Sequence, residues 1–253
     1  MARLRLLNAN WYPGAALAAS SEALALPVAA SAHPDRSYVW RSLAEASAQM
    51  IDIDLGAVRA VTCVALANVK LLAGGVVALY QRGDGATPGD ATLVATLPAA
   101  NADRRVTFAF FAQASHRHWQ LRWTNPGPVE DYAELGFAYL GTYFEPTVNV
   151  TVPMDVAEVD PSIVRQSVDR QRSTVSRTRY TMGQFAWVGL PDADRGDLRA
   201  LWGTLGSAHP VFAVLDETRS WTAWMLYLQG QITERFREVD GRYDVGLEWE
   251  EAT

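Results

Sequence analysis

An alternation of apolar and acidic residues over residues 50–55 constrains the fold of this chain more than any other feature. Successive side chains of a β-strand point to opposite faces, so Ile53 and its apolar neighbours are expected to pack inward. The carboxylates of Asp52 and Asp54 then lie together on the opposite face. The alternation stops at Gly56, which predicts the end of the strand. This stretch therefore predicts a half-buried strand with one polar face.

Short runs of this kind recur over residues 1 to about 145 and are separated by residues typical of turns. The runs cover residues 4–7, 50–55, 61–66, 76–80, 92–97, 106–111, 118–123 and 136–144. Turn signals between them include Gly74-Gly75 and Pro88-Gly89-Asp90. Regularly spaced short strands with such punctuation predict a β-sandwich or jelly roll for residues 1–145.

The character of the chain changes near Pro146, and residues 146–253 are expected to form a second domain. Residues 147–152, 210–215, 223–228, 231–238 and 242–250 are strand-like, and an arginine-rich polar stretch covers 165–179. The only convincing helix begins at Pro191 and Asp192, carries the apolar stripe Leu198, Leu201, Trp202 and Leu205, and ends at Gly206. The predicted fold class is therefore mainly β: an N-terminal β-sandwich or jelly roll plus a C-terminal β-barrel-like domain with one helix.

Composition excludes several classes of protein. Of the 253 residues, 49% are apolar and 20% are charged, which suffices for packed cores and argues against disorder. The formal net charge of −6 argues against a dedicated nucleic-acid binder, which normally presents a basic face. Cys63 is the single cysteine, so no intrachain disulfide can form, and we expect a buried, inert thiol.

Neither membrane insertion nor a secretion signal is expected. No apolar run reaches the roughly 18 residues that a membrane span needs. Polar residues such as Asn8, Asn10 and Ser20 interrupt the region where a signal peptide would need an apolar core. The sequence therefore predicts a soluble protein made in a cytoplasm.

Several stretches of the first half, taken in order, resemble discoidin-type (galactose-binding-like) jelly rolls. A polar loop that contains Asp35, Trp40 and Ser42 is similar to the family's loop that ends in a tryptophan and a serine. Residues 51–56 are similar to its Ile-Asp-Leu-Gly strand, residues 118–121 to its Tyr-Trp-Arg-Leu strand, and residues 136–141 to its closing strand. The resemblance covers about residues 8–144 and implies a binding or structural module.

The order of elements in the second half is similar to that of tail-tip proteins of long-tailed phages, in the distal tail or baseplate hub class. The similarity rests on the arginine-rich stretch, the single helix, the apolar strand 211–215 and the closing stretch 243–250. It implies a structural virion protein that forms a homo-oligomeric ring, expected to be a hexamer, and that contacts the tail tube and the hub. Such a protein is assembled in the host cytoplasm and resides at the tail tip. In better-known members the ring domain comes first in the chain, whereas here the jelly roll does.

Aromatic residues in loop-like sequence are candidate contacts to a glycan, because sugar rings stack on exposed aromatic faces. The candidates are Trp11, Tyr12, Tyr38 and Tyr132. Tyr132 follows a polar loop that includes Asn125, Pro126, Glu130 and Asp131. Trp40 lies in similar sequence, but we favour a core position for it. These residues support an alternative function, a carbohydrate-binding, lectin-like module accessory to an enzyme; in a virion protein the same surface would contact host glycans.

The arginine-rich stretch and a later acidic set are candidate subunit contacts. The arginines are Arg165, Arg170, Arg172, Arg177 and Arg179, and the acidic residues are Glu234 and Glu238. Opposite charge on two parts of one domain suits a head-to-tail ring, in which the basic surface of one subunit meets the acidic surface of the next. Salt bridging within the domain explains the same pattern equally well. Nucleic-acid binding is not expected, because the stretch lacks interleaved aromatic residues.

No catalytic residue, metal site or cofactor is expected, and the chain is not predicted to be an enzyme. Asp52 and Asp54 would need an opposed partner and a cleft to act as an acid–base pair, and a solvated face or an arginine partner is the simpler interpretation. His116 and His118 lack the further ligands that zinc requires. No Gly-x-Ser-x-Gly elbow or phosphate-binding glycine loop is present. A hydrolase built on this sandwich would instead require paired carboxylates in a cleft.

Overall fold

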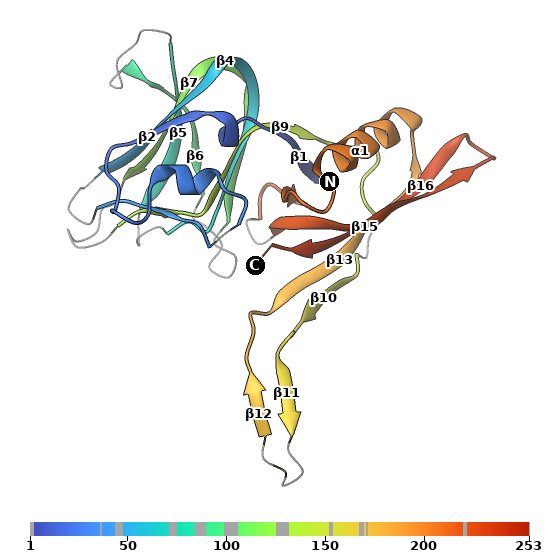
Figure 1. Ribbon diagram of the computed structural model, residues 1–253. Helices are drawn as coiled ribbons and strands as arrows, with labels where there is room; N and C mark the ends of the chain where they lie inside the picture. The colour runs from blue at the N-terminus through green and yellow to red at the C-terminus, as the bar shows by residue number, and fades with distance from the viewer. Residues whose placement is uncertain are drawn as a thin grey trace. The chain divides into compact units, whose positions relative to one another are not determined.

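The computed structural model describes residues 3–35, 37–43, 48–70, 75–83, 90–98, 106–124, 132–151, 154–166, 170, 172–219 and 222–252. Within these residues the chain is mainly β with one α-helix, which confirms the prediction of a mainly β fold with one helix (Figure 1). The chain divides into two compact units. The first contains Met1–Glu145 and Phe212–Met225, and the second contains Pro146–Val211 and Leu226–Thr253. Across the described residues, no helix has the length and apolar character needed to cross a membrane.

The first unit is a β-sandwich. Its strands are β1 (Arg5–Asn10), β2 (Ala16–Ala19), β3 (Trp40–Arg41), β4 (Ala48–Ala67), β5 (Val76–Arg82), β6 (Thr92–Leu97), β7 (Thr107–Thr124), β8 (Glu134–Leu135), β9 (Phe137–Phe144) and β14 (Val211–Val214), with the short 3-10 helices η1 (Tyr12–Gly14) and η2 (Val28–Ala32). The strand order is β14–β1–β9–β4–β7–β5–β6, with β2 paired to β4. The strands β3 and β8 form a separate pair.

Two long strands, β4 and β7, serve both layers of the sandwich. The predicted strands 50–55 and 61–66 are one continuous 20-residue strand, β4. Gly56, which was expected to end the strand, adopts a φ of 73° inside it, and the pairing with β7 shifts register between Asp54 and Arg59. Before this shift β4 pairs with β2, and after it with β9. Glycine permits the bend without ending the ladder, since it has no Cβ to clash at positive φ.

The predicted alternation places the core of the first unit correctly. Ile51 and Ile53 are buried in a cluster that also contains Trp40 and Trp123. The Trp40 and Trp123 ring centroids lie 5.2 Å apart, and Trp40 Nε1 donates to the carbonyl oxygen of Ser21 (3.2 Å). The prediction that Trp40 is a core residue is therefore confirmed.

The segment Phe212–Met225 returns to the first unit from the second half of the sequence. Its strand β14 pairs with β1 in the register Arg5↔Val214 and Leu6↔Ala213. Phe212 stacks on Phe137 with 6.1 Å between the ring centroids. The sequence alone placed this segment with residues 146–253, because a pairing between strands so far apart leaves no local signal.

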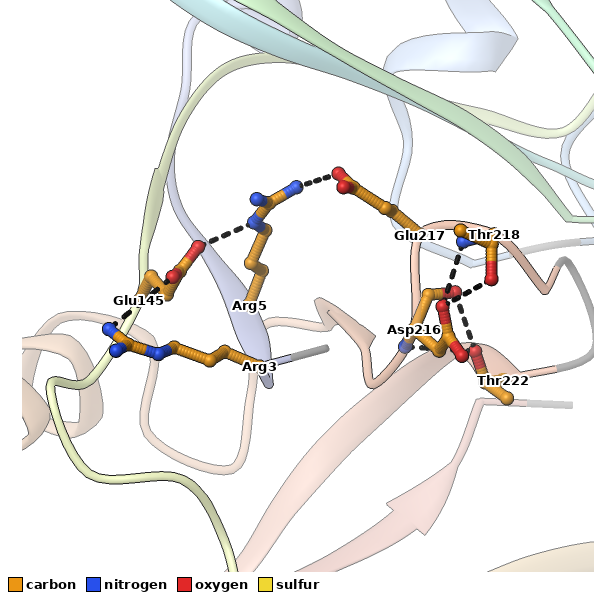
Figure 2. Close-up of polar contacts among 7 residues, drawn as sticks. All are labelled: Arg3, Arg5, Glu145, Asp216, Glu217, Thr218 and Thr222. Carbon is orange, nitrogen blue, oxygen red and sulfur yellow. Dashed lines mark hydrogen bonds and ion pairs between the residues drawn. The ribbon is translucent and has the colours of Figure 1, made fainter. Parts of the chain in front are cut away.

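Arg5 forms ion pairs that hold the segment Phe212–Met225 against the first unit (Figure 2). Its Nε lies 2.7 Å from Oε2 of Glu145, and its Nη1 pairs with Glu217 from the segment. The same guanidinium lies 4.4 Å from the centre of the Phe110 ring. Beside Glu217, Asp216 accepts hydrogen bonds from the backbone N–H and the hydroxyl of Thr218 (2.9 and 2.7 Å), which orders the turn. A buried aromatic contact and a shared arginine thus hold the segment in place.

The second unit is an open β-sheet with one helix. Its elements are β10 (Val156–Val159), β11 (Ile163–Gln166), β12 (Arg172–Val175), β13 (Tyr180–Leu190), α1 (Asp192–Leu205), β15 (Ala223–Arg237), whose first residues belong to the first unit, and β16 (Arg242–Glu251). The strand order is β10–β13–β16–β15, and β11 and β12 form a separate ribbon. The expected barrel-like closure is not formed among the described residues, since β10 and β15 lie at opposite ends of this order.

The helix follows its predicted pattern, and one predicted strand before it does not form. Leu198 and Leu201 are buried, and Gly206 ends the helix with its N–H donating to the carbonyl oxygen of Trp202 (2.7 Å). Asp194 in the first turn accepts hydrogen bonds from the backbone N–H and the hydroxyl of Thr147 (2.8 and 2.6 Å). Residues 147–151 are irregular rather than strand-like, and the Asp194 side chain takes the backbone N–H of Thr147, which begins the stretch.

Candidate functional site

The neighbours Trp11 and Tyr12 have different surroundings. Tyr12 is 0% exposed, and its hydroxyl is hydrogen-bonded to Oγ of Ser31 (2.8 Å). Burial raises the pKa of Tyr12. A ring without an exposed face cannot stack on a sugar, so the prediction that Tyr12 contacts a glycan is wrong: η1 carries this side chain into the core, where its hydroxyl finds a partner.

Trp11 is half-buried at the edge of the same core. Its Nε1 donates to the carbonyl oxygen of Ala60 (3.3 Å), and the guanidinium of Arg59 lies 4.8 Å from its ring centre. The indole is therefore anchored at its polar edge and approached by a cation. That leaves Trp11 a weaker candidate for sugar stacking than a freely presented ring.

Tyr38 is presented to solvent, with 52% of its surface exposed. Its ring packs against His33 with 4.2 Å between the centroids, and its backbone N–H donates to the carbonyl oxygen of Asp35 (3.1 Å). The backbone N–H of Ser37 donates to Oδ1 of Asp35 (2.8 Å), which holds the pKa of that carboxyl below its usual range. We call Tyr38 and His33 the Tyr38 pair; it is an exposed aromatic surface on a turn that side chains stabilise.

Tyr132 lies among charged residues beside the paired strands β3 and β8. The guanidinium of Arg41 lies 4.1 Å, and Nζ of Lys70 3.6 Å, from the centre of its ring. Nη2 of Arg41 lies 3.6 Å from Oε2 of Glu134, and the backbone N–H of Lys70 donates to the carbonyl oxygen of Glu134 (3.0 Å). We call Tyr132, Arg41, Lys70 and Glu134 the Tyr132 cluster. The loop residues 125–131 that were named with Tyr132 lie outside the described residues.

The Tyr38 pair and the Tyr132 cluster together offer the groups that carbohydrate recognition uses. Tyrosine rings supply apolar faces, the arginine and lysine supply donors, and the carboxylate supplies an acceptor. β3 begins two residues after Tyr38 and contains Arg41, so the two groups are neighbours in the sequence. Sequence reasoning missed Arg41, Lys70 and Glu134, which come from separate segments. One signal was available, since Lys70 is the only lysine in a chain rich in arginine.

The predicted subunit-contact residues fall in the second unit and do not meet one another within the chain. The five arginines, Arg165, Arg170, Arg172, Arg177 and Arg179, are all exposed, and Glu238 is exposed as well. Glu234 is paired with Arg195 (3.2 Å) and Arg199 (3.3 Å), so salt bridging inside the unit accounts for this carboxylate. Arg179 lies 3.3 Å from Asp160. Among the described residues no ion pair joins these arginines to Glu234 or Glu238.

The opening pair of carboxylates is matched by partners on the same sheet face. Asp54 accepts two hydrogen bonds from Arg117, at Nε and Nη2 (2.7 Å each). Asp52 accepts from Nε2 of Gln120 (2.7 Å) and lies 3.7 Å from Arg82. The arginine and the Gly56 N–H hold the pKa of Asp54 well below its usual range. The interpretation of a local arginine partner is confirmed, and within the described part of the chain no group of three or more His, Cys, Asp or Glu residues is arranged to hold a metal.

No family model and no curated protein matches the chain. Solved structures to which it is similar include carbohydrate-binding modules. Chitosan-binding module 1 from a chitosanase/glucanase of Paenibacillus sp. IK-5 matches with a TM-score of 0.46 and 19% identity, over 53% of this chain and 99% of that chain. Module 2 of the same enzyme, in complex with chitotriose, matches with a TM-score of 0.45 and 20% identity, over 53% of this chain and 100% of that chain. The family 32 module of Clostridium perfringens NanJ, in complex with galactose, matches with a TM-score of 0.43 and 15% identity, over 56% of this chain and 99% of that chain.

Proposed function

We propose that the first unit is a non-catalytic carbohydrate-binding module. One observation carries the proposal: the Tyr38 ring is 52% exposed, and β3, two residues further along the chain, supplies Arg41 to the Tyr132 cluster of cationic donors and a carboxylate. A sugar ring stacked on the exposed Tyr38 keeps its hydroxyl groups at its rim, where the cations Arg41 and Lys70, which already lie against the Tyr132 ring, are candidate donors to them. The module serves either as an accessory to a carbohydrate-active enzyme or as a glycan-contacting surface of a larger assembly.

A glycan array with the full chain, followed by calorimetric titration of each hit, tests this function. Chitotriose and galactose, the sugars named for similar structures, are the first probes. Tyr38→Ala and Tyr132→Ala are each expected to weaken binding about tenfold, or about 1.4 kcal/mol. Phe236→Ala is the matched control, because it removes an exposed aromatic ring from the second unit. An array without any bound glycan overturns the function, and binding that survives both tyrosine substitutions overturns the site.

We propose a structural role in the tail tip of a long-tailed phage as the second candidate function. The observation that favours it is the β11–β12 ribbon, in which every residue of both strands is exposed. A ribbon without a buried face suits a protein that is completed by its neighbours in an assembly. Detection of the chain in purified tailed particles, and neighbouring genes for a tape measure or a tail hub, are the expected results. A protein that is absent from such particles contradicts this role and leaves carbohydrate binding untouched.

A further inference from the structure

The β11–β12 ribbon lacks the internal support that a hairpin normally has. Its strands pair only with each other, in the register Ile163↔Val175 to Gln166↔Arg172 (Figure 1). Val164 and Val175 are 49% and 54% exposed and lie on opposite faces of the ribbon, so each face carries apolar surface. An isolated two-stranded hairpin is marginally stable in water. The ribbon therefore gains stability from any surface that covers one of its faces.

Four arginines on or beside the ribbon have no charge partner among the described residues. Arg165 and Arg172 lie on its strands, and Arg170 and Arg177 flank β12. None of these four side chains has an ion-pair or hydrogen-bond partner among the described residues, whereas Arg179 at the base is paired with Glu158 and Asp160. The protein as a whole carries a formal net charge of −6. An unpaired basic arm on an acidic protein is complementary to other surfaces of the same protein.

The matching surface lies on the open sheet of the second unit. Cross-strand pairing puts Glu248 in a row with Gln184 and Gln229, and Glu250 in a row with Met182 and Tyr227. We call these six residues the Glu248 face. It lies opposite the buried face that contains Phe185, Leu247 and Trp249, and neither Glu248 nor Glu250 has an ion-pair partner among the described residues. Met182, which is 44% exposed, adds apolar surface beside the two carboxylates.

We propose that the β11–β12 ribbon of one copy docks on the Glu248 face of a second copy of this chain. The ribbon face that carries Arg165 and Val175 then meets the Glu248 face, with the arginine beside Glu248 and Glu250 and the valine against Met182. Charge complementarity selects this occupant, because the unmatched cations and the unmatched carboxylates lie on different surfaces of one unit. The two surfaces differ, so the contact is head-to-tail and generates a ring or an open fibre rather than a two-fold dimer. The inference deepens the structural role proposed above and is independent of carbohydrate binding.

Charge reversal on each surface tests the contact. One variant carries Arg165→Glu and Arg172→Glu, and the other carries Glu248→Arg and Glu250→Arg. Each variant alone places like charges opposite each other and is expected to weaken self-association about 100-fold, measured by sedimentation of the full chain over a range of concentrations. An equal mixture restores opposite charges at every contact and is expected to reassemble. Reassembly also shows that both variants are folded.

Asp197→Arg is the matched control, because it reverses an exposed acidic residue on α1, an element that contributes no residue to the Glu248 face; it is expected to leave assembly unchanged. A wild-type chain that is monomeric at every concentration overturns the contact. An oligomer that persists in both variants also overturns the contact. It does not overturn the structural role, which is tested separately by the presence of the chain in tailed particles. Two dissociated variants that do not reassemble on mixing overturn the pairing of the ribbon with this face.

Discussion

The β4–β7 face of the first unit and the β11–β12 ribbon of the second both present charged side chains on β-strands. On the β4–β7 face each carboxylate has a partner, as in the double hydrogen bond between Arg117 and Asp54. On the ribbon, Arg165 and Arg172 have none among the described residues. The first surface also lies on strands whose other side is buried, whereas both strands of the ribbon are exposed throughout. This difference indicates that charged side chains on a strand face stabilise the fold when they are paired within the chain. When they are not paired, they are available to bind another surface.

Breaking the matched face should have the largest effect on stability. In a double-mutant cycle with Asp54→Ala and Arg117→Ala, the expected coupling free energy is about 1 kcal/mol, measured by urea unfolding. Two parallel hydrogen bonds give this pair more than an ordinary surface ion pair contributes, although partial exposure limits the gain. A coupling near zero would mean that the matched face contributes nothing to stability, and the contrast with the ribbon would fail.

Acid should weaken the same face. The depressed pKa of Asp54 means that the unfolded chain, with a carboxyl pKa of about 3.9, binds protons at a higher pH than the folded chain. The stability that the pair provides is therefore fully present above about pH 4 and is lost as the pH falls towards the folded pKa. Asp54→Asn should flatten the decline of the unfolding free energy with pH in this range, measured by urea unfolding at each pH. If the unfolding free energy of Asp54→Asn depends on pH as steeply as that of the wild type, Asp54 is not the source of the decline.

The sequence predicted the parts of the fold that rest on local patterns. Alternation identified the inward face of β4, and the i, i+3, i+4 stripe identified α1. It did not predict that Gly56 lies inside a continuous strand, because glycine at a bend and glycine at a strand end look the same in sequence. It also missed the return of Phe212–Met225 to the first unit, which depends on pairing between strands about 200 residues apart along the chain.

The candidate site was predicted only in part, for a related reason. Tyr38 and Tyr132 were identified by residue type and loop context, and Tyr12 was misplaced because burial of a single aromatic residue near a turn leaves no periodic signal. Arg41, Lys70 and Glu134 meet at Tyr132 only after β3 pairs with β8. Residue type therefore predicts which side chains suit a glycan, whereas the pairing of distant strands decides which of them come together.

The two predicted acidic contacts allow a finer form of the comparison. Glu234→Ala removes the partner of Arg195 and Arg199, and it should lower the free energy of unfolding by about 0.5 kcal/mol. Glu238→Ala removes an exposed carboxylate that has no partner among the described residues and should leave stability unchanged. Thermal unfolding of the two variants side by side measures the difference. Equal effects would show that pairing inside the unit does not distinguish these carboxylates.

The smallest effect is expected on the ribbon itself. Arg165→Ala and Arg172→Ala together should change the free energy of unfolding of the dilute chain by less than about 0.5 kcal/mol, because exposed side chains without partners contribute little. The same double variant should lower self-association, and added salt should lower it in the wild type, since exposed charges across a contact are screened. Urea unfolding at low concentration and sedimentation at high concentration separate the two effects. A clear loss of stability in the dilute chain would mean that the arginines act within one copy. The charges of the ribbon would then be structural, like those of the β4–β7 face.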